Sequence, residues 1–122
     1  MHLLILDDDS MIRDLYSRLL KRHFDNIVTV ASVDEAIAHM GTGAKVDMVL
    51  SDVMMPGKLG PEFHAWLVDQ KNPLADKVVF ATGGFSVDIG AYLRSIPNKV
   101  LTKPVGRKEL VSALCQVSFL AL

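Results

Sequence analysis

The chain has 122 residues, of which 50% are hydrophobic and 22% are charged, a composition typical of one globular domain with a single core. The formal net charge of -1 excludes a strongly positive field that would attract nucleic acid or an anionic membrane, so any partner must be recognised locally. The single cysteine, Cys115, excludes an intramolecular disulfide, and the sequence offers no Cys and His cluster for structural zinc. We expect a reducing, cytoplasmic setting without a signal peptide or membrane helix.

Short apolar runs recur along the chain at the spacing of strands that alternate with helices. They cover residues 3–6, 27–30, 46–50, 78–81 and 100–101. Most of these runs are continuous rather than alternating, which is typical of strands that are buried on both faces. The pattern therefore predicts five parallel strands covered by helices.

The first helix is predicted between the first two strands. Its apolar stripe recurs at spacings of three and four residues: Ile12, Leu15, Tyr16, Leu19 and Leu20. The opposite face is basic: Arg13, Arg18, Lys21 and Arg22. We expect this helix to pack on the sheet through the stripe.

Capping signals mark the next two helices. Ser32 and Glu35 form a capping box, in which each side chain satisfies a free backbone amide, and this second helix should end near Gly41 or Gly43. Pro61 suits the first turn of a third helix because its missing N–H has no intrahelical partner there. The third helix should bury three large side chains: Phe63, Trp66 and Leu67.

The sequence favours the fifth helix more strongly than the fourth. Gly83 and Gly84 precede the fourth, and Gly90 lies inside it, so we expect a short and mobile helix. The fifth should begin near Gly106 and bury one apolar side: Leu110, Ala113, Leu114 and Val117. The apolar end at residues 119–122 fits core packing, a dimer contact or a cut from a longer protein.

Five strand–helix units in so short a chain predict an α/β fold. The economical arrangement is a three-layer, doubly wound, flavodoxin-like domain with a five-stranded parallel sheet in the order 2-1-3-4-5. In such a sheet, ligands bind at the carboxyl ends of the strands, where the strand order reverses. We therefore expect the functional site between the first and third strands.

Acidic residues follow both of these strands. Asp7, Asp8 and Asp9 end the first strand and Asp52 ends the third, so several carboxylates should converge. Two charges about 4 Å apart repel by about 4 kcal/mol at an effective dielectric constant of about 20, so the cluster needs neutralisation. All-oxygen ligation suits Mg²⁺, with Mn²⁺ as a substitute.

Two further polar residues should reach the same edge. Thr82 follows the fourth strand, and Lys103 follows the fifth and precedes Pro104, so the peptide bond between them can be cis. A carboxylate beside a divalent cation, an ammonium group and a hydroxyl can perform phosphoryl transfer. In this interpretation Asp52 is the nucleophile.

Four segments together resemble a known family. They are Leu-Asp-Asp-Asp at 6–9, Ser-Asp-Val-Met-Met-Pro-Gly at 51–57, Phe-Ala-Thr-Gly at 80–83 and Leu-Thr-Lys-Pro at 101–104. In this order and spacing the chain resembles the receiver domain of bacterial two-component response regulators. The resemblance extends over essentially the whole chain, residues 1–122, and implies the same doubly wound fold.

The resemblance also implies roles for individual residues. Three would act at the phosphoryl group, with the first as phosphoacceptor: Asp52, Thr82 and Lys103. Four would ligate Mg²⁺, the last through its backbone carbonyl: Asp7, Asp8, Asp52 and Met54. The phosphoryl donor would be a histidine kinase, a phosphotransfer domain or a small acyl phosphate, and the output would be binding to a downstream protein target rather than enzymatic turnover.

One position departs from the pattern of the family. Receivers commonly carry an aromatic residue three positions before the lysine, where it turns inward as the Thr hydroxyl moves to the phosphate, and this chain has Val100. We expect phosphorylation to act instead on the loop from Thr82 through Phe85, which contains two glycines.

Two other functions compete with a receiver. The spacing of Asp7 and Asp9 also resembles an aspartyl-phosphate hydrolase of the haloacid dehalogenase type, with Asp7 as nucleophile and Asp9 as acid/base, although only Glu109 follows Lys103 where an acidic pair is needed. Asp9 could equally cap the first helix. A flavodoxin-like cofactor carrier is disfavoured because three aspartates would repel a flavin phosphate.

The remaining candidates have ordinary structural interpretations. The four histidines, His2, His23, His39 and His64, are expected at the surface or partly packed, and Cys115 in the core. Residues 82–84 and 97–104 are similar to receivers at the end of hybrid histidine kinases, so a free-standing regulator and an excised domain both remain open. A weak homodimer is a further expectation.

Overall fold

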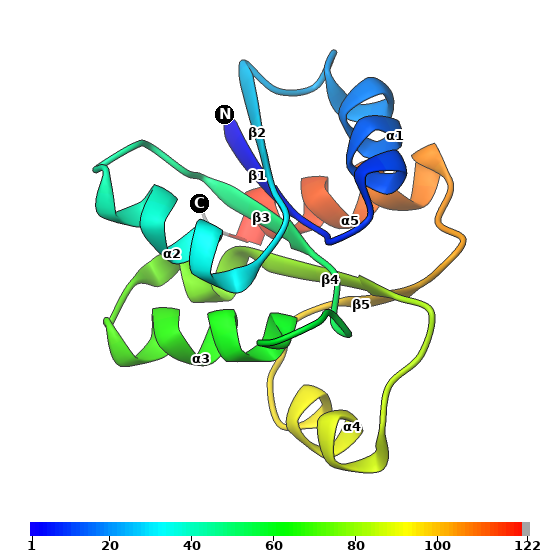
Figure 1. Cartoon of the computed structure of the whole chain (residues 1–122). Coiled ribbons are helices and arrows are strands. Elements are labelled where there is room, and N and C mark those ends of the chain that lie inside the picture. Colours follow the sequence, from blue (N-terminus) through cyan, green and yellow to red (C-terminus); the bar gives the residue numbers. More distant parts are fainter. Residues whose placement is uncertain (121–122) are drawn as a thin grey trace.

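Five parallel strands form one sheet in the order β2-β1-β3-β4-β5 in the computed structural model (Figure 1), which describes the backbone of residues 1–120 and the side chains of residues 1–118. The strands are β1 (His2–Leu6), β2 (Asn26–Val30), β3 (Met48–Ser51), β4 (Val78–Thr82) and β5 (Val100–Thr102). Each lies on a predicted apolar run, although β3 begins at Met48, two residues after the start of the run at 46–50. The predicted strand order is confirmed.

The connecting helices cover both faces of this sheet (Figure 1). Within residues 1–120 they are α1 (Ser10–Leu20), α2 (Val33–Gly41), α3 (Gly60–Asp69), α4 (Val87–Arg94) and α5 (Arg107–Leu120), with a short 3-10 helix, η1 (Pro73–Lys77), before β4. As expected, α2 ends at the first glycine and α4 is short. None of the described helices is long and apolar enough to cross a membrane.

Two hydrophobic clusters make the three layers. Successive residues of β1 alternate between them: Leu4 and Leu6 face α2, α3 and α4, whereas Leu3 and Ile5 face α1 and α5. The four residues are between 0 and 2% exposed. Because both faces are apolar and covered, the strand reads as a continuous hydrophobic run, which explains the pattern in the sequence.

Local capping fixes where α1 and α2 begin. Asp9 caps α1, since its Oδ1 accepts the N–H groups of Met11 and Ile12 at 2.9 and 3.4 Å. Ser32 caps α2 by accepting the N–H of Glu35 at 3.1 Å. The Glu35 carboxylate reaches the N–H of Ala31 at 3.0 Å, one residue before the partner expected for a capping box.

The predicted stripe of α1 is wrong at one position. Leu15 is 46% exposed, while Tyr16 and Leu20 are buried. At about 100° per residue, Leu15 lies at one margin of the stripe and Arg13 at the other. The helix turns the Arg13 margin inward, where its guanidinium Nη1 donates to the Asp7 carbonyl at 2.8 Å.

Two further predictions about single residues are wrong. His64 is only 4% exposed, because α3 packs it against β4 and α4, and it is a core residue rather than a surface one. Cys115 is exposed, because α5 turns Leu114 rather than Cys115 toward the sheet. Trp66 of α3 is half-buried and stacks on Phe63. The side chains of residues 119–122 lie outside the described part, so the expectations for the apolar end stay predictions.

Gly60 lets the backbone of α3 approach the end of β3. A Cβ atom at this position would lie 1.9 Å from the Asp52 carbonyl oxygen and 2.8 Å from the Ser51 hydroxyl. The Gly60 N–H also donates to the Val53 carbonyl at 2.9 Å. The start of α3 therefore holds the segment that carries Asp52.

We expect Gly60→Ala to lower the free energy of unfolding by about 2 kcal/mol, because the overpacked backbone must shift. Urea denaturation followed by circular dichroism measures this change. Gly41→Ala is the matched control: its Cβ would meet nothing within 4 Å, so it should leave the stability unchanged or slightly raised. Equal effects of both substitutions would contradict a role for close approach at Gly60.

Candidate functional site

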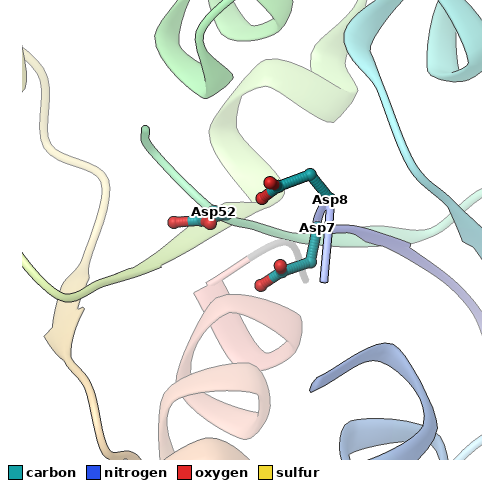
Figure 2. Close-up of side chains that lie close together, drawn as sticks. All are labelled: Asp7, Asp8 and Asp52. Atoms are coloured by element: carbon teal, nitrogen blue, oxygen red, sulfur yellow. The ribbon is translucent and has the colours of Figure 1, made fainter. Parts of the chain in front are cut away.

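Three carboxylates meet at the carboxyl edge of β1 and β3. Leu6 pairs with Ser51 across these neighbouring strands, so the residues that follow, Asp7 and Asp52, leave the sheet side by side. Each of Asp7, Asp8 and Asp52 offers an oxygen within 4.8 Å of the others' (Figure 2). The structure thus brings together the three acidic side chains predicted as metal ligands.

The burial of the three carboxylates differs. Asp7 is 1% and Asp52 8% exposed, whereas Asp8 is open to solvent. Burial raises the pKa of Asp52, and the charge of Asp7 raises it further, while Lys103 and the backbone N–H of Val53 act in the opposite direction. Asp52 is therefore a carboxylate whose negative charge is incompletely compensated by the protein.

Lys103 provides the positive charge inside the cluster. Its Nζ donates to Asp7 Oδ2 at 2.9 Å and lies 3.4 Å from Asp52 Oδ2. Burial alone would lower the pKa of Lys103, but its hydrogen bond to Asp7 and the charges of Asp7 and Asp52 raise it. The Lys103–Pro104 peptide is cis, and the Lys103 N–H donates to the Thr82 carbonyl at 2.8 Å. The side chain thus stays charged and joins both carboxylates.

The backbone fixes the carboxylate of Asp52. Its Oδ1 accepts the N–H of Val53 at 2.7 Å, and its own N–H donates to the Leu6 carbonyl at 2.7 Å. The buried Ser51 hydroxyl donates to the Asp52 carbonyl at 2.7 Å. These bonds orient Asp52 before any ligand arrives.

Thr82 is at the site's edge but is turned toward its own loop. Its hydroxyl donates to the Gly84 carbonyl at 2.8 Å and accepts the Gly84 N–H at 3.1 Å. Thr82 is 3% exposed, so these two bonds satisfy a buried hydroxyl. The predicted contact between Thr82 and a phosphoryl group would require the hydroxyl to leave Gly84.

Met54 follows Asp52 by two residues in the connection between β3 and α3. Its side chain is 44% exposed, which fits the expectation that only its backbone carbonyl acts in the site. Gly57 of the same connection has a φ of 79°, a backbone conformation that favours glycine. The carbonyl of Met54 as a fourth ligand stays a prediction.

Two residues at the site were not recognised in the sequence. Arg13 holds the Asp7 carbonyl, and Tyr16, which is 3% exposed, lies near the cluster. Burial raises the pKa of Tyr16; Lys103 lowers it, and Asp7 and Asp52 raise it. Periodicity assigned Arg13 to the polar face and Tyr16 to the stripe of α1, and no motif marks either residue as part of a site.

The donor set fits a small, hard divalent cation. Two buried carboxylates and one exposed carboxylate converge, and an all-oxygen set of this kind is what Mg²⁺ and Mn²⁺ prefer. The exposed side of Asp8 leaves room for the water ligands that Mg²⁺ retains. The geometry is consistent with a cation that reduces the repulsion between Asp7, Asp8 and Asp52.

We expect Mg²⁺ to raise the thermal unfolding midpoint of the wild-type chain, because a ligand that binds only the folded state stabilises it. Asp8→Asn should weaken Mg²⁺ binding at least tenfold while leaving the fold intact, since Asp8 is exposed. Asp34→Asn removes a carboxylate bonded to Lys58 on the surface and serves as the control. Identical Mg²⁺ titrations for wild type and Asp8→Asn would contradict the metal site.

Fold and site together define a doubly wound α/β domain with an acidic cluster and a lysine at the switch point of the sheet. The model of the response regulator receiver domain family matches residues 3–115. The chain therefore belongs to the response regulator receiver domain family. This membership confirms the resemblance inferred from the four sequence segments.

Curated relatives and solved structures agree with this assignment. The chain is 31% identical over 120 residues to a positive alginate biosynthesis regulatory protein of Pseudomonas aeruginosa and 28% identical over 109 residues to an uncharacterized transcriptional regulatory protein, YbdJ, of Bacillus subtilis. These alignments cover 97 and 89% of the chain but 47% of each relative. The chain thus spans about half the length of these two regulators.

Two solved structures illustrate the similarity in fold. The chemotaxis protein CheY4 of Vibrio cholerae has a TM-score of 0.78 and 26% identity, with 95% of this chain and 97% of that chain covered. The receiver domain of a Luxo repressor protein of Vibrio parahaemolyticus has a TM-score of 0.82 and 22% identity, with 98 and 94% covered. The flavodoxin-like receiver fold predicted from the sequence is confirmed.

Proposed function

We propose that this chain is a phosphoryl acceptor in two-component signalling and that Asp52 is the phosphorylated residue. The observation that supports it best is the buried Asp52 carboxylate, placed 3.4 Å from Lys103 and within 4.8 Å of Asp7 and Asp8. Membership of the receiver family supports the same role. We infer that residues 1–122 act as one receiver domain.

In the reaction, a carboxylate oxygen of Asp52 attacks phosphorus in line. The bond between phosphorus and the donor's imidazole nitrogen, or the acyl oxygen of a small acyl phosphate, breaks as the new bond to Asp52 forms. Lys103 neutralises charge on the transferred group, since its ammonium already lies between Asp7 and Asp52. Asp7, Asp8, Asp52 and the Met54 carbonyl would hold Mg²⁺ or Mn²⁺, which would supply further electrostatic stabilisation.

Phosphorylation would change the position of Thr82. A phosphoryl group adds three oxygen acceptors close to Asp52, and the Thr82 hydroxyl can donate to one of them once it leaves Gly84. Both bonds to Gly84 would then be lost, which frees the loop from Thr82 to Phe85. Indistinguishable loop conformations with and without a phosphoryl mimic would contradict this step.

The hydrolase alternative, with Asp7 as nucleophile, is not favoured. Both carboxylate oxygens of Asp7 already accept hydrogen bonds, one from Lys103 at 2.9 Å and one from the N–H of Asp9 at 3.0 Å. The Asp9 side chain caps α1 and is thereby occupied. These contacts, together with the family match, support acceptance of a phosphoryl group rather than repeated turnover.

The partners follow from this role. The donor is a histidine kinase or phosphotransfer protein that carries a phosphohistidine, and the output is contact with a downstream protein target in the cytoplasm, without direct binding to nucleic acid or a membrane by this domain. Because the chain spans about half of its curated relatives, the activity of the whole protein depends on what else it contains. We also propose that this domain is either a free-standing regulator or part of a hybrid histidine kinase. Two copies of the chain would form a weak homodimer.

The test is to map the phosphorylated residue. The chain is incubated with acetyl phosphate and Mg²⁺, the acid-labile adduct is trapped by borohydride reduction, and the modified peptide is identified by mass spectrometry. Modification of Asp52 supports the proposal, and modification of Asp7 supports the hydrolase. A receiver protein of Thermotoga maritima, 22% identical, forms a complex with Mg²⁺ and BeF, so beryllofluoride is the matching stable mimic.

A further inference from the structure

A buried histidine and a tyrosine join α3 to α4. His64 Nδ1 lies 2.7 Å from the Tyr92 hydroxyl, and the two rings meet edge to face, with centroids 5.8 Å apart and planes at 79°. His64 is 4% exposed. The centroid of its ring also lies 6.3 Å from that of Phe80 in β4, the strand that ends at Thr82. The pair therefore connects α3 and α4 to this strand of the sheet.

The protonation state of His64 determines the direction of this hydrogen bond. Burial lowers the pKa of His64, while the charge of Asp76 and the Asn98 side chain act in the opposite direction. The ring is therefore neutral at neutral pH, and its tautomer determines whether Nδ1 accepts the proton of the Tyr92 hydroxyl or donates its own.

Asn98, in the connection between α4 and β5, makes hydrogen bonds near His64. Its Nδ2 donates to the carbonyls of Ala75 and Val78, both at 2.8 Å. Among residues 1–118, its buried Oδ1 has no hydrogen-bond partner within normal geometry, although the side chain is close enough to His64 to raise its pKa. Asn98 thus holds the chain that follows α4 and lies close to His64.

Apart from its hydrogen bond to His64, α4 packs on the core through apolar side chains: Leu93 is 5% exposed and Ile89 is partly buried against the same cluster. Between α4 and the remaining described helices and strands, the bond from Tyr92 to His64 is the single side-chain hydrogen bond. The helix has eight residues with Gly90 inside, and Phe85 of the preceding loop packs on that glycine, 3.1 Å from where a Cβ would lie. Figure 1 shows α4 beside α3, joined to β4 by residues 83–86 and to β5 by residues 95–99.

The loop at Thr82 leads directly into α4. Thr82 binds Gly84, Phe85 contacts Gly90, and α4 begins at Val87. When Thr82 leaves Gly84, the loop that carries Phe85 can move, and the start of α4 moves with it. On β5, Val100 is a half-buried aliphatic residue, whereas α4 itself carries one aromatic residue, Tyr92.

We propose that the hydrogen bond between Tyr92 and His64 is a latch that holds α4 against α3 in the unphosphorylated protein and opens when the Thr82 loop rearranges. This inference rests on the proposed phosphoryl acceptance by Asp52. It assigns to a tyrosine of α4 the part for which β5 has no aromatic residue. The partner-binding surface that changes would then be the exposed side of α4, including Val87.

Removing the latch shifts the balance between the two arrangements. The bond between Tyr92 and His64 stabilises only the arrangement in which α4 is held against α3. A net hydrogen bond is worth roughly a three- to tenfold change in an equilibrium constant. Tyr92→Phe keeps the ring but deletes the hydroxyl. We expect its apparent affinity for beryllofluoride in the presence of Mg²⁺ to rise about three- to tenfold.

The experiment titrates the whole chain with beryllium and fluoride in constant Mg²⁺ and follows backbone amide NMR signals of α4. Hydrogen exchange of the free protein gives a second measurement, in which Tyr92→Phe should speed exchange in α4 but not in α2. His64→Leu removes the same bond from the side of α3, because leucine can neither donate nor accept, and it should raise the affinity in parallel. Ser95→Ala is the control, because it removes a hydrogen bond to the Tyr92 carbonyl without touching His64.

The outcomes separate the latch from the proposed function. If wild type binds beryllofluoride but Tyr92→Phe and His64→Leu bind it with unchanged or weaker affinity, the latch is overturned and phosphoryl acceptance stands. An equal increase for Ser95→Ala also overturns the latch, because general weakening of α4 would then suffice. If wild type itself fails to bind, phosphoryl acceptance is overturned and the latch with it.

Discussion

Asp52→Asn should abolish phosphoryl acceptance, with the acid-labile adduct formed from acetyl phosphate reduced at least a hundredfold. An amide oxygen is a far weaker nucleophile than a carboxylate, and no neighbouring carboxylate occupies the position fixed by the Val53 N–H. Adduct formation is measured by intact-protein mass spectrometry in Mg²⁺. Asp47→Asn is a suitable control, because this carboxylate lies at the opposite end of β1, where it accepts the His2 N–H.

The same substitution should stabilise the fold. Burial and Asp7 raise the pKa of Asp52 above its ordinary value of 3.8, so the folded state disfavours the charged form. The wild-type chain bears this penalty while the pH lies above the raised pKa, and it is relieved as the pH falls through the raised pKa toward 3.8. In the absence of Mg²⁺, Asp52→Asn should therefore raise the free energy of unfolding by about 1 kcal/mol at pH 7, and by less toward pH 4.

Urea denaturation at several pH values measures this difference. A gain in stability that stays constant between pH 7 and pH 4 would contradict the assignment of the penalty to the ionised carboxylate. A loss of stability at pH 7 would show that the bonds from Val53 and Lys103 outweigh the repulsion by Asp7.

The fold was predictable because each level of the sequence agrees with the others. Strands buried on both faces need continuous apolar runs, and the capping residues Asp9 and Ser32 mark the starts of α1 and α2. The convergence of Asp7 and Asp52 then follows from topology, because the carboxyl ends of β1 and β3 are neighbours in any sheet of this strand order.

The parts that escaped prediction depend on side-chain packing between elements. His64 and Tyr92 are 28 residues apart, and neither α3 nor α4 shows a local pattern that distinguishes a buried polar pair from a surface one. The exposure of Leu15 and the inward position of Arg13 depend on a small rotation of α1 about its axis. Periodicity defines the apolar face of a helix only to within about one residue at each margin.

Lys103→Met should produce the largest loss of stability among the site variants, about 3 kcal/mol at pH 7 without Mg²⁺. The substitution leaves Asp7, whose side chain is 2% exposed, without the cation that binds its Oδ2, and it removes the charge that offsets Asp52. Asp7, Asp52 and Tyr16 keep Lys103 charged, so this contribution is present at neutral pH and is lost only as the pH rises above 10.5.

The response of this variant to Mg²⁺ tests the electrostatic account of the whole site. An ammonium group among the carboxylates repels a second cation, so Lys103→Met should gain more stability from saturating Mg²⁺ than wild type gains. Lys99→Met is the matched control, since Lys99 is exposed and binds only Gln116 at 2.6 Å among the described side chains. If Mg²⁺ stabilised wild type and Lys103→Met equally, Lys103 and the cation would not share the same carboxylates, and the proposed geometry of phosphoryl transfer would fail with them.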